Sequence, residues 1–146
     1  MAEPHAIRDG AHRWPVRVYY EDTDASGIVY YANHLKYAER ARTELLRALG
    51  VDHPALLERF GLVFVVRRCL ADYRAPARLD DALEVITRLA RLGGAAMDLV
   101  QEVSRDGCLL VRLDVRLALL SRSLAPARVP QELRALLTPL RASAAK

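Results

Sequence analysis

The sequence has few cysteines and almost no lysine. Cys69 and Cys108 are the only cysteines among 146 residues, and without a CxxC pair they carry neither a zinc nor a redox signature. Both lie in strand-like stretches, so we expect two reduced core residues, as is typical of a cytoplasmic protein. Lys36 and Lys146 are the only lysines, so arginine supplies nearly all the positive charge. The net charge of +4 suits a polyanionic partner such as nucleic acid, a membrane surface or coenzyme A, and does not choose among them.

Long apolar runs are also absent. None approaches the ~20 residues that a membrane span needs, and residues 1–13 lack the apolar stretch of a signal peptide. We expect these residues to form a flexible tail. A hydrophobic content of 52% with 27% charged residues indicates a globular chain. Residues 14–141 therefore fit one domain, since domains typically span ~100–200 residues.

Two periodicities define the first half of the chain. Residues 14–21 alternate in polarity, which predicts a half-buried strand. From about Tyr31 to Leu49 the apolar residues recur at helical spacing, which predicts a long helix with one apolar stripe. The stripe consists of Ala32, Leu35, Ala38, Ala41, Leu45 and Leu49. His34, in the first turn, is expected at the surface, and a short helix is predicted from Pro54 to Arg59.

The second half is dominated by strand signals. Strands are predicted over residues 62–73, 83–92, 95–105 and 109–119, with hairpin turns at Gly93-Gly94 and Asp106-Gly107. Pro130 opens a predicted helix that runs to Leu140. One long helix and one antiparallel sheet make an α+β fold, in which a curved sheet wraps around the helix.

An acidic loop precedes the long helix. Glu21, Asp22 and Asp24 are followed by Gly27 and then by the helix start. A helix N-terminus offers unpaired N–H groups and a partial positive charge, which suit an anion or an oxyanion. A carboxylate beside it can attack a carbonyl or activate water. The same pattern also serves as a turn or helix cap. Metal binding is disfavoured because no EF-hand pattern is present and His34 is isolated.

Three segments resemble a known family. Residues 18–33, VYYEDTDASGIVYYAN, resemble the active-site signature of the 4-hydroxybenzoyl-CoA thioesterase family of hotdog proteins. Residues 39–44, ERARTE, and 73–81, YRAPARLDD, are similar to the branch associated with the Tol–Pal cell-envelope system. The resemblance spans roughly residues 16–129. It implies a hotdog fold, with an antiparallel sheet wrapped around one long central helix.

The resemblance also assigns residues. It implies Asp24 as the catalytic nucleophile or general base, and the backbone N–H of Tyr31 as the group that polarises the thioester carbonyl. The substrate-binding residues that it implies are Gly27, Ile28, Val29, Tyr30 and Asn33. For the coenzyme A phosphates we expect Arg91 and Arg74. No metal or organic cofactor is expected beyond coenzyme A as part of the substrate.

The chain departs from the family at three places, of which Ser26 in place of a glycine is the mildest. Many members carry histidine at the position of Tyr31, and a backbone N–H survives that change. Members also often have a basic residue at the turn occupied here by Gly93-Gly94, where Arg91 would substitute.

Hydrolysis of an acyl-CoA, or of an acyl group on a carrier protein, is the expected function. The alternative is a non-catalytic module that binds an acyl carrier or an envelope-complex partner. Nucleic-acid binding ranks last because the arginines are dispersed. We expect a homodimer or homotetramer, which the resemblance implies, and the sequence leaves the acyl group open.

Overall fold

The computed structural model describes residues 7–140, and its framework is one antiparallel sheet of five strands in the order β1-β3-β4-β5-β2. The strands are β1 (His12–Arg17), β2 (Leu62–Tyr73), β3 (Ala82–Leu92), β4 (Ala96–Arg105) and β5 (Cys108–Ser121). The helices are α1 (Tyr31–Ala48), α2 (His53–Phe60) and α3 (Gln131–Leu137), with short 3₁₀ helices η1 (Tyr20–Asp22) and η2 (Thr138–Leu140). The predicted α+β order of a strand, a long helix and four further strands is confirmed. The predicted four-stranded meander is wrong, because only β3, β4 and β5 are consecutive neighbours and β2 pairs with β5 at the edge.

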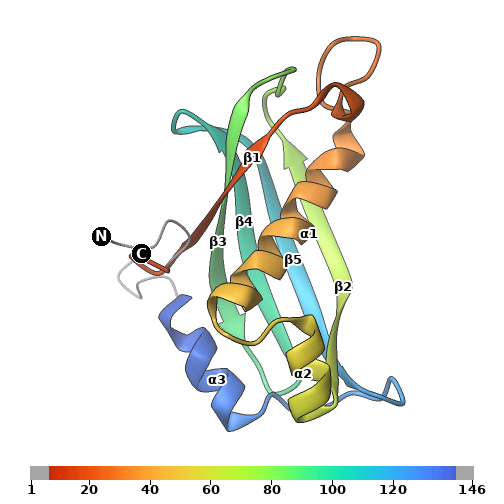
Figure 1. Ribbon diagram of the computed structural model, residues 1–146, viewed down its shortest axis with the longest axis vertical. Helices are drawn as coiled ribbons and strands as arrows, with labels where there is room; N and C mark the ends of the chain where they lie inside the picture. Colours follow the sequence, from red (N-terminus) through yellow and green to blue (C-terminus); the bar gives the residue numbers. More distant parts are fainter. Residues whose placement is uncertain (1–6, 141–146) are drawn as a thin grey trace.

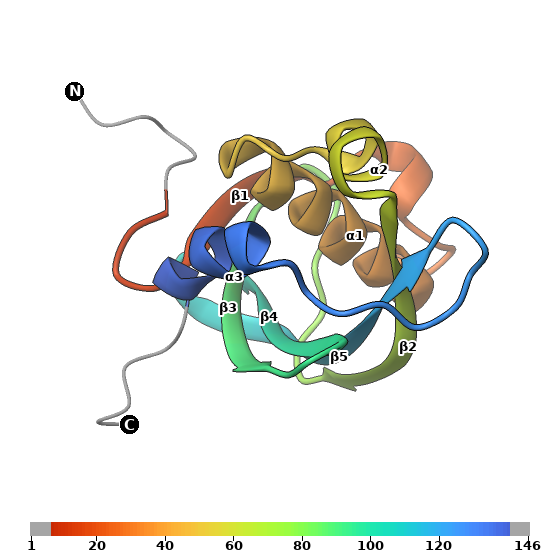
Figure 2. The same ribbon diagram turned by 90° about the horizontal axis from the view of Figure 1, so that it is seen from below.

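The sheet curls around α1, which lies across its concave face, while α3 closes one end (Figures 1 and 2). Ala38 and Ala41 have no exposed surface, so the helix backbone approaches the strands closely. The Gln101 side chain on β4 donates to the Ala38 carbonyl at 3.0 Å, which fixes the helix against the sheet. The small side chains of α1 therefore pack against the inward-facing residues of the sheet, which are every second residue along each strand.

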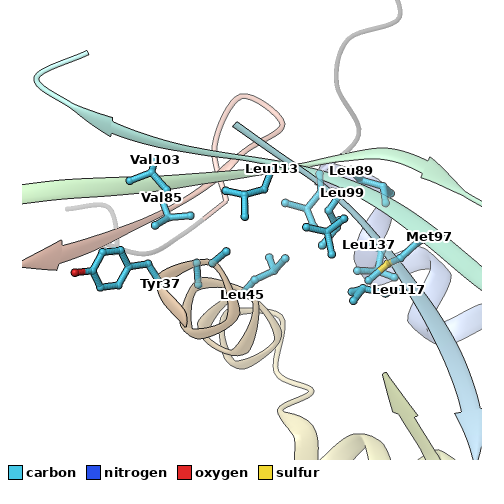
Figure 3. Close-up of a cluster of buried hydrophobic side chains, with 14 of the residues drawn as sticks. Tyr37, Leu45, Val85, Leu89, Met97, Leu99, Val103, Leu113, Leu117 and Leu137 are labelled. Carbon is cyan, nitrogen blue, oxygen red and sulfur yellow. The ribbon is translucent and has the colours of Figure 1, made fainter. Parts of the chain in front are cut away.

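The core lies between α1 and the strands. Figure 3 shows Tyr37 and Leu45 of α1 facing Val85, Leu99 and Leu113 of three different strands. Each of these side chains is at most 1% exposed. On β5 the alternation of buried and half-buried residues follows the predicted period of two.

The two predicted hairpin turns differ. Asp106 and Gly107 both have positive φ, 51° and 79°, which suits the tight two-residue turn that joins β4 to β5. Neither Gly93 nor Gly94 has positive φ. The β3–β4 connection closes instead through the Gly93 N–H, which donates to the Ala96 carbonyl at 2.8 Å. The two-residue turn predicted at Gly93-Gly94 is therefore wrong.

Two further expectations need correction. Strand β1 begins at His12, and Ala11 and His12 are buried, so the expected tail does not extend to residue 13. Residues 1–6 of that tail lie outside the described part. Cys69 and Cys108 are free thiols, as expected, but both are exposed rather than in the core. Cys69 lies on the edge strand β2, and Cys108 follows the β4–β5 turn.

We expect Leu113→Ala to lower the free energy of unfolding by about 2–5 kcal/mol, because it leaves a cavity in the centre of the core. Leu113 has no exposed surface, whereas Leu124 is 67% exposed and serves as the control. Leu124→Ala should change the value by less than about 0.5 kcal/mol. Urea denaturation of both variants checks this, and equal losses would contradict the placement of Leu113 in the core.

Candidate functional site

The acidic loop is a closed turn around Asp24. The Asp24 N–H donates to the Ile28 carbonyl at 2.9 Å, and the Gly27 N–H donates to the Asp24 carbonyl at 2.9 Å. The Ser26 N–H donates to Asp24 Oδ1 at 2.8 Å. Asp24 Oδ2 has no hydrogen bond or ion pair with any residue in the range 7–140. One carboxylate oxygen thus holds the turn, while the other is uncommitted on an exposed side chain.

Gly27 has a backbone reason to be glycine. Its φ is +77°, in the left-handed region that side chains disfavour. A Cβ placed there would meet nothing within 4 Å in the described structure. The positive φ of the turn therefore explains why this residue is glycine, whereas a lack of space for a side chain does not.

A second acid, Asp22, ties the loop to the start of α1. Its backbone carbonyl accepts from the Tyr30 N–H at 2.9 Å and from Asn33 Nδ2 at 2.8 Å. Its carboxylate accepts from the Tyr19 N–H at 2.8 Å. The Asn33 side chain, which the resemblance implied for substrate binding, is thus engaged in holding the loop against the helix.

The N-terminus of α1 is open. Tyr30 is the N-cap residue, and no side chain caps the helix. The Asn33 N–H already donates to the Tyr30 carbonyl at 2.8 Å. The N–H groups of Tyr31 and Ala32 have no acceptor among residues 7–140. Because the first N–H groups of a helix have no intrahelical partner, these two are available to an oxyanion.

Tyrosine rings surround this helix start. The rings of Tyr30 and Tyr31 lie 4.9 Å apart, and those of Tyr31 and Tyr73 lie 5.9 Å apart in an edge contact. The Tyr73 hydroxyl donates to the Tyr31 carbonyl at 3.1 Å, which joins the end of β2 to α1. All three side chains are more than 40% exposed. By contrast, Val29 is buried in the core, and Ile28 is half-buried.

His34 is buried, against the expectation of a surface position. It is 3% exposed, and its ring contacts Tyr37 and Tyr73 edge to face. Burial lowers the pKa of His34 from 6.5 to about 4, so the ring is neutral at pH 7. Leu35, predicted in the apolar stripe, is 40% exposed instead. The buried face of α1 is thus rotated by about one residue, because His34, Tyr37 and Ala38 face the sheet.

The two arginines expected at the coenzyme A phosphates lie at opposite ends of the sheet. Arg74 directly follows Tyr73 and is at the Asp24 end, where its Nε donates to Asp72 at 3.0 Å. Strand β3 begins at the Asp24 end of the sheet, and Arg91 is near the other end of this strand. Arg91 is nine positions after Ala82, which corresponds to roughly 30 Å. Within one chain, the structure brings Arg74 to the site and leaves Arg91 away from it.

Comparison with known proteins identifies the family. Residues 18–137 match the model of the thioesterase-like superfamily, and this range contains the acidic loop, α1 and strands β2 to β5. The chain belongs to the thioesterase-like superfamily. The neighbouring solved structures are hotdog-fold thioesterases, which confirms the predicted hotdog fold.

Three similar proteins illustrate the relationship within this superfamily. The chain is 41% identical to the acyl-CoA thioesterase YbgC of Haemophilus influenzae over 128 residues, which are 87% of this chain and 94% of that protein. It is 50% identical to the acyl-CoA thioester hydrolase YbgC of Escherichia coli over 92 residues, 62% of this chain and 67% of that one. A probable thioesterase from Bartonella henselae, 37% identical, superposes with a TM-score of 0.78 over 82% of this chain and 99% of its own.

Two further features of this thioesterase-family chain concern ligands and membranes. Within residues 7–140, no three histidine, cysteine or acidic side chains gather closely enough to hold a metal ion. None of the helices in the same range is long and apolar enough to cross a membrane.

The low pKa of His34 predicts a pH-dependent stability. Below pH 6.5 the unfolded chain takes up a proton on His34, whereas the folded chain does so only near pH 4. The free energy of unfolding should therefore fall as the pH is lowered from 6.5 to 4, by up to about 3 kcal/mol. Urea denaturation at several pH values measures the slope.

His34→Phe should flatten that slope, whereas His53→Phe, at an exposed histidine of α2, should keep it. An unchanged slope in His34→Phe would show that His34 is not the titrating group.

Proposed function

We propose that this chain hydrolyses acyl-CoA thioesters, with Asp24 as the catalytic carboxylate and the Tyr31 N–H as the oxyanion donor. One observation carries the proposal: the turn that holds Asp24 is bonded directly to the start of a long helix whose first N–H groups are open. The relatives named as acyl-CoA thioesterases favour this substrate class.

The chemistry follows from these two groups. The thioester carbonyl oxygen rests on the Tyr31 N–H, which stabilises the negative charge that develops as the carbonyl carbon is attacked. Asp24 either attacks this carbon itself or removes a proton from an attacking water. When Asp24 attacks, the C–S bond breaks to leave the acyl group on Asp24 as a mixed anhydride, which water then hydrolyses to the carboxylic acid and free Asp24. When Asp24 activates water, the C–S bond breaks and the acid forms without this intermediate. In both cases the coenzyme A sulfur leaves as a thiolate and takes up a proton that the water supplies.

Two arginines, one near Asp24 and one far from it in the same chain, are proposed to contact the coenzyme A phosphates. Arg74 lies beside the aromatic rim in the same chain and would meet the coenzyme A phosphates after leaving Asp72. Arg91 would reach them only from a second copy, because the length of β3 separates it from Asp24. The Gly27 turn, Ile28 and Tyr30 would contact the thioester group of the substrate. Asn33 and Val29 would contribute indirectly, by holding the backbone of the site in position.

A second copy is proposed to pair along β2, the edge strand of the sheet. Val66 is 50% exposed and Leu70 is 58% exposed on this strand, although both are large apolar residues. An unpaired edge with apolar side chains is a surface that proteins normally cover. The result is a homodimer, from which a homotetramer can be built.

Other functions fit less well. A non-catalytic module that binds an acyl carrier or an envelope-complex partner would not require an uncommitted Asp24 oxygen beside open amides. An acyl carrier protein as the donor of the acyl group, a cytoplasmic location and membership of the Tol–Pal branch remain part of the proposal.

Asp24→Asn should lower kcat for acyl-CoA hydrolysis by at least about 10²-fold, because an amide is neither a base nor a competent nucleophile. Glu21→Gln is the matched control, since Glu21 is an exposed acid in the same loop with no ion pair among residues 7–140. Thiol release from a panel of acyl-CoAs measures both. Equal turnover by wild type and Asp24→Asn would remove Asp24 from catalysis, and binding without thiol release by wild type would favour the non-catalytic module.

Val66→Arg should dissociate the proposed dimer, because it places a charge in the apolar centre of the β2 edge. Sedimentation velocity measures the mass, and thiol release measures the accompanying loss of activity. Leu124→Arg, in an exposed loop, should leave both unchanged. A wild-type chain that sediments as an active monomer is the result that rules out the dimer.

A further inference from the structure

A groove runs between α1 and the edge strand β2. It consists of two adjoining cavities of about 270 and 470 Å³ that share Glu39, Arg42 and Val66 as lining residues. Leu35 and Cys69 line the smaller cavity, and Phe64 lines the larger one. Most lining residues are apolar; Glu39 and Arg42 lie where the cavities meet, and Lys36 lines the smaller cavity.

On α1, the first residue that lines the groove is Leu35, four positions after Tyr31 of the proposed catalytic site. Tyr31, Leu35, Glu39 and Arg42 are spaced by four, four and three residues, so they lie along one side of the helix. The Tyr73 hydroxyl at the end of β2 bonds to the Tyr31 carbonyl, just before the groove on the helix. An acyl group whose carbonyl rests on the Tyr31 N–H would extend along this side of α1 to reach the groove and Arg42.

Arg42 is held in place by a buried amide. Its Nη1 donates to Gln101 Oε1 at 2.9 Å. The orientation of that amide is set on its other side, because Gln101 Nε2 donates to the Ala38 carbonyl and to Thr87 Oγ1, both at 3.0 Å. Gln101 has no exposed surface. The guanidinium is therefore anchored by a network that leaves its remaining N–H groups uncommitted.

No carboxylate within residues 7–140 forms an ion pair with Arg42. Three other half-buried arginines do have such a partner: Arg88 faces Glu102, Arg105 faces Asp81, and Arg116 faces Asp98. Half-buried Arg134 has no ion pair within residues 7–140 and donates to the Gly93 carbonyl. Glu39 is near enough to act on Arg42 electrostatically, but no Glu39 oxygen lies within 4.0 Å of the guanidinium. Because Arg42 lines the groove and its only hydrogen-bond partner is a neutral amide, its remaining N–H groups can bind an anion from outside the chain.

We propose that Arg42 binds a carboxylate at the far end of the acyl chain, so that the enzyme prefers thioesters of dicarboxylic acids. This rests on the proposed function, since it assumes that the acyl carbonyl lies at Tyr31. Arg42 is eleven positions after Tyr31 on α1, which is roughly 16 Å of helix. The arginine side chain leans back toward the helix N-terminus and shortens that span by several ångströms. The fitting acyl chain is of medium length.

Matched pairs of substrates test the preference directly. The pairs are adipoyl-CoA with hexanoyl-CoA, suberoyl-CoA with octanoyl-CoA, and sebacoyl-CoA with decanoyl-CoA, which differ only in the terminal carboxylate. Wild type should show a kcat/KM at least about 10-fold higher for the dicarboxylic member of one pair. The absence of a dicarboxylic preference in all three pairs overturns the inference while the proposed function stands. Failure to hydrolyse any of the six contradicts the proposed function itself.

Arg42→Met should remove the preference, lowering kcat/KM for the dicarboxylic substrate by about 10²-fold and leaving the matched monocarboxylic one within a few-fold. Arg42→Lys keeps the charge and should restore part of the preference. Arg40→Met, which removes an exposed arginine of the same helix, is the control and should change neither value. Dissociation of Arg42→Met into monomers with an unchanged substrate ratio would make Arg42 an interface residue and overturn the inference.

Glu39→Gln keeps the inference testable if Arg42→Met fails to fold. Glu39 lines the same junction of the groove, and its negative charge opposes an incoming carboxylate. Its removal should raise the dicarboxylic preference several-fold. An unchanged or lowered preference in Glu39→Gln counts against a carboxylate at this position.

Discussion

The bonds that the Asp22 carbonyl accepts hold the site together. The loop and the helix are separate elements, and the Tyr30 N–H and the Asn33 side chain join them at this one oxygen. The Asp22 carboxylate also takes up the Tyr19 N–H. Asp22 therefore does the structural work that acids before helices commonly do. Asp24 is consequently left with an oxygen that no structural role requires, and this separation of duties within one loop favours a chemical role for Asp24.

An open helix start is costly, and the rest of the fold offsets that cost. A missing side-chain cap typically lowers helix stability by about 1 kcal/mol. Here α1 is held by its packing instead: Ala38 and Ala41 lie flat against the sheet, and Gln101 bonds to the Ala38 carbonyl. Because tertiary packing supplies most of the stability of a protein helix, the first N–H groups can stay free for a ligand. The same Gln101 anchors Arg42, so the position of the helix and that of the groove charge are linked.

The sequence predicts the elements well because their signals are local. Alternation and helical spacing predict the order of a strand, a long helix and four further strands, and Asp106-Gly107 predicts its turn because two positive φ values are needed there. The face of α1 is less predictable, since His34 is buried and Leu35 is exposed only because of where the sheet lies. The exposure of Cys69 likewise depends on the strand order, which places β2 at an edge. At the site, the acidic loop can be found from its pattern and resemblance, whereas the bond between Arg42 and Gln101 joins residues 59 positions apart.

Three features that look unrelated have one physical solution. The groove beside α1 opens along β2, the β2 edge exposes Val66 and Leu70, and Arg91 lies a full strand away from Asp24. A second copy paired along β2 would roof the groove, cover the apolar edge and bring its own arginines toward the site. Roofing also removes water from around Arg42 and the Tyr31 N–H, and electrostatic interactions strengthen when water is excluded. A single chain thus carries the reacting groups, and pairing along β2 would give them the low-dielectric surroundings in which they act.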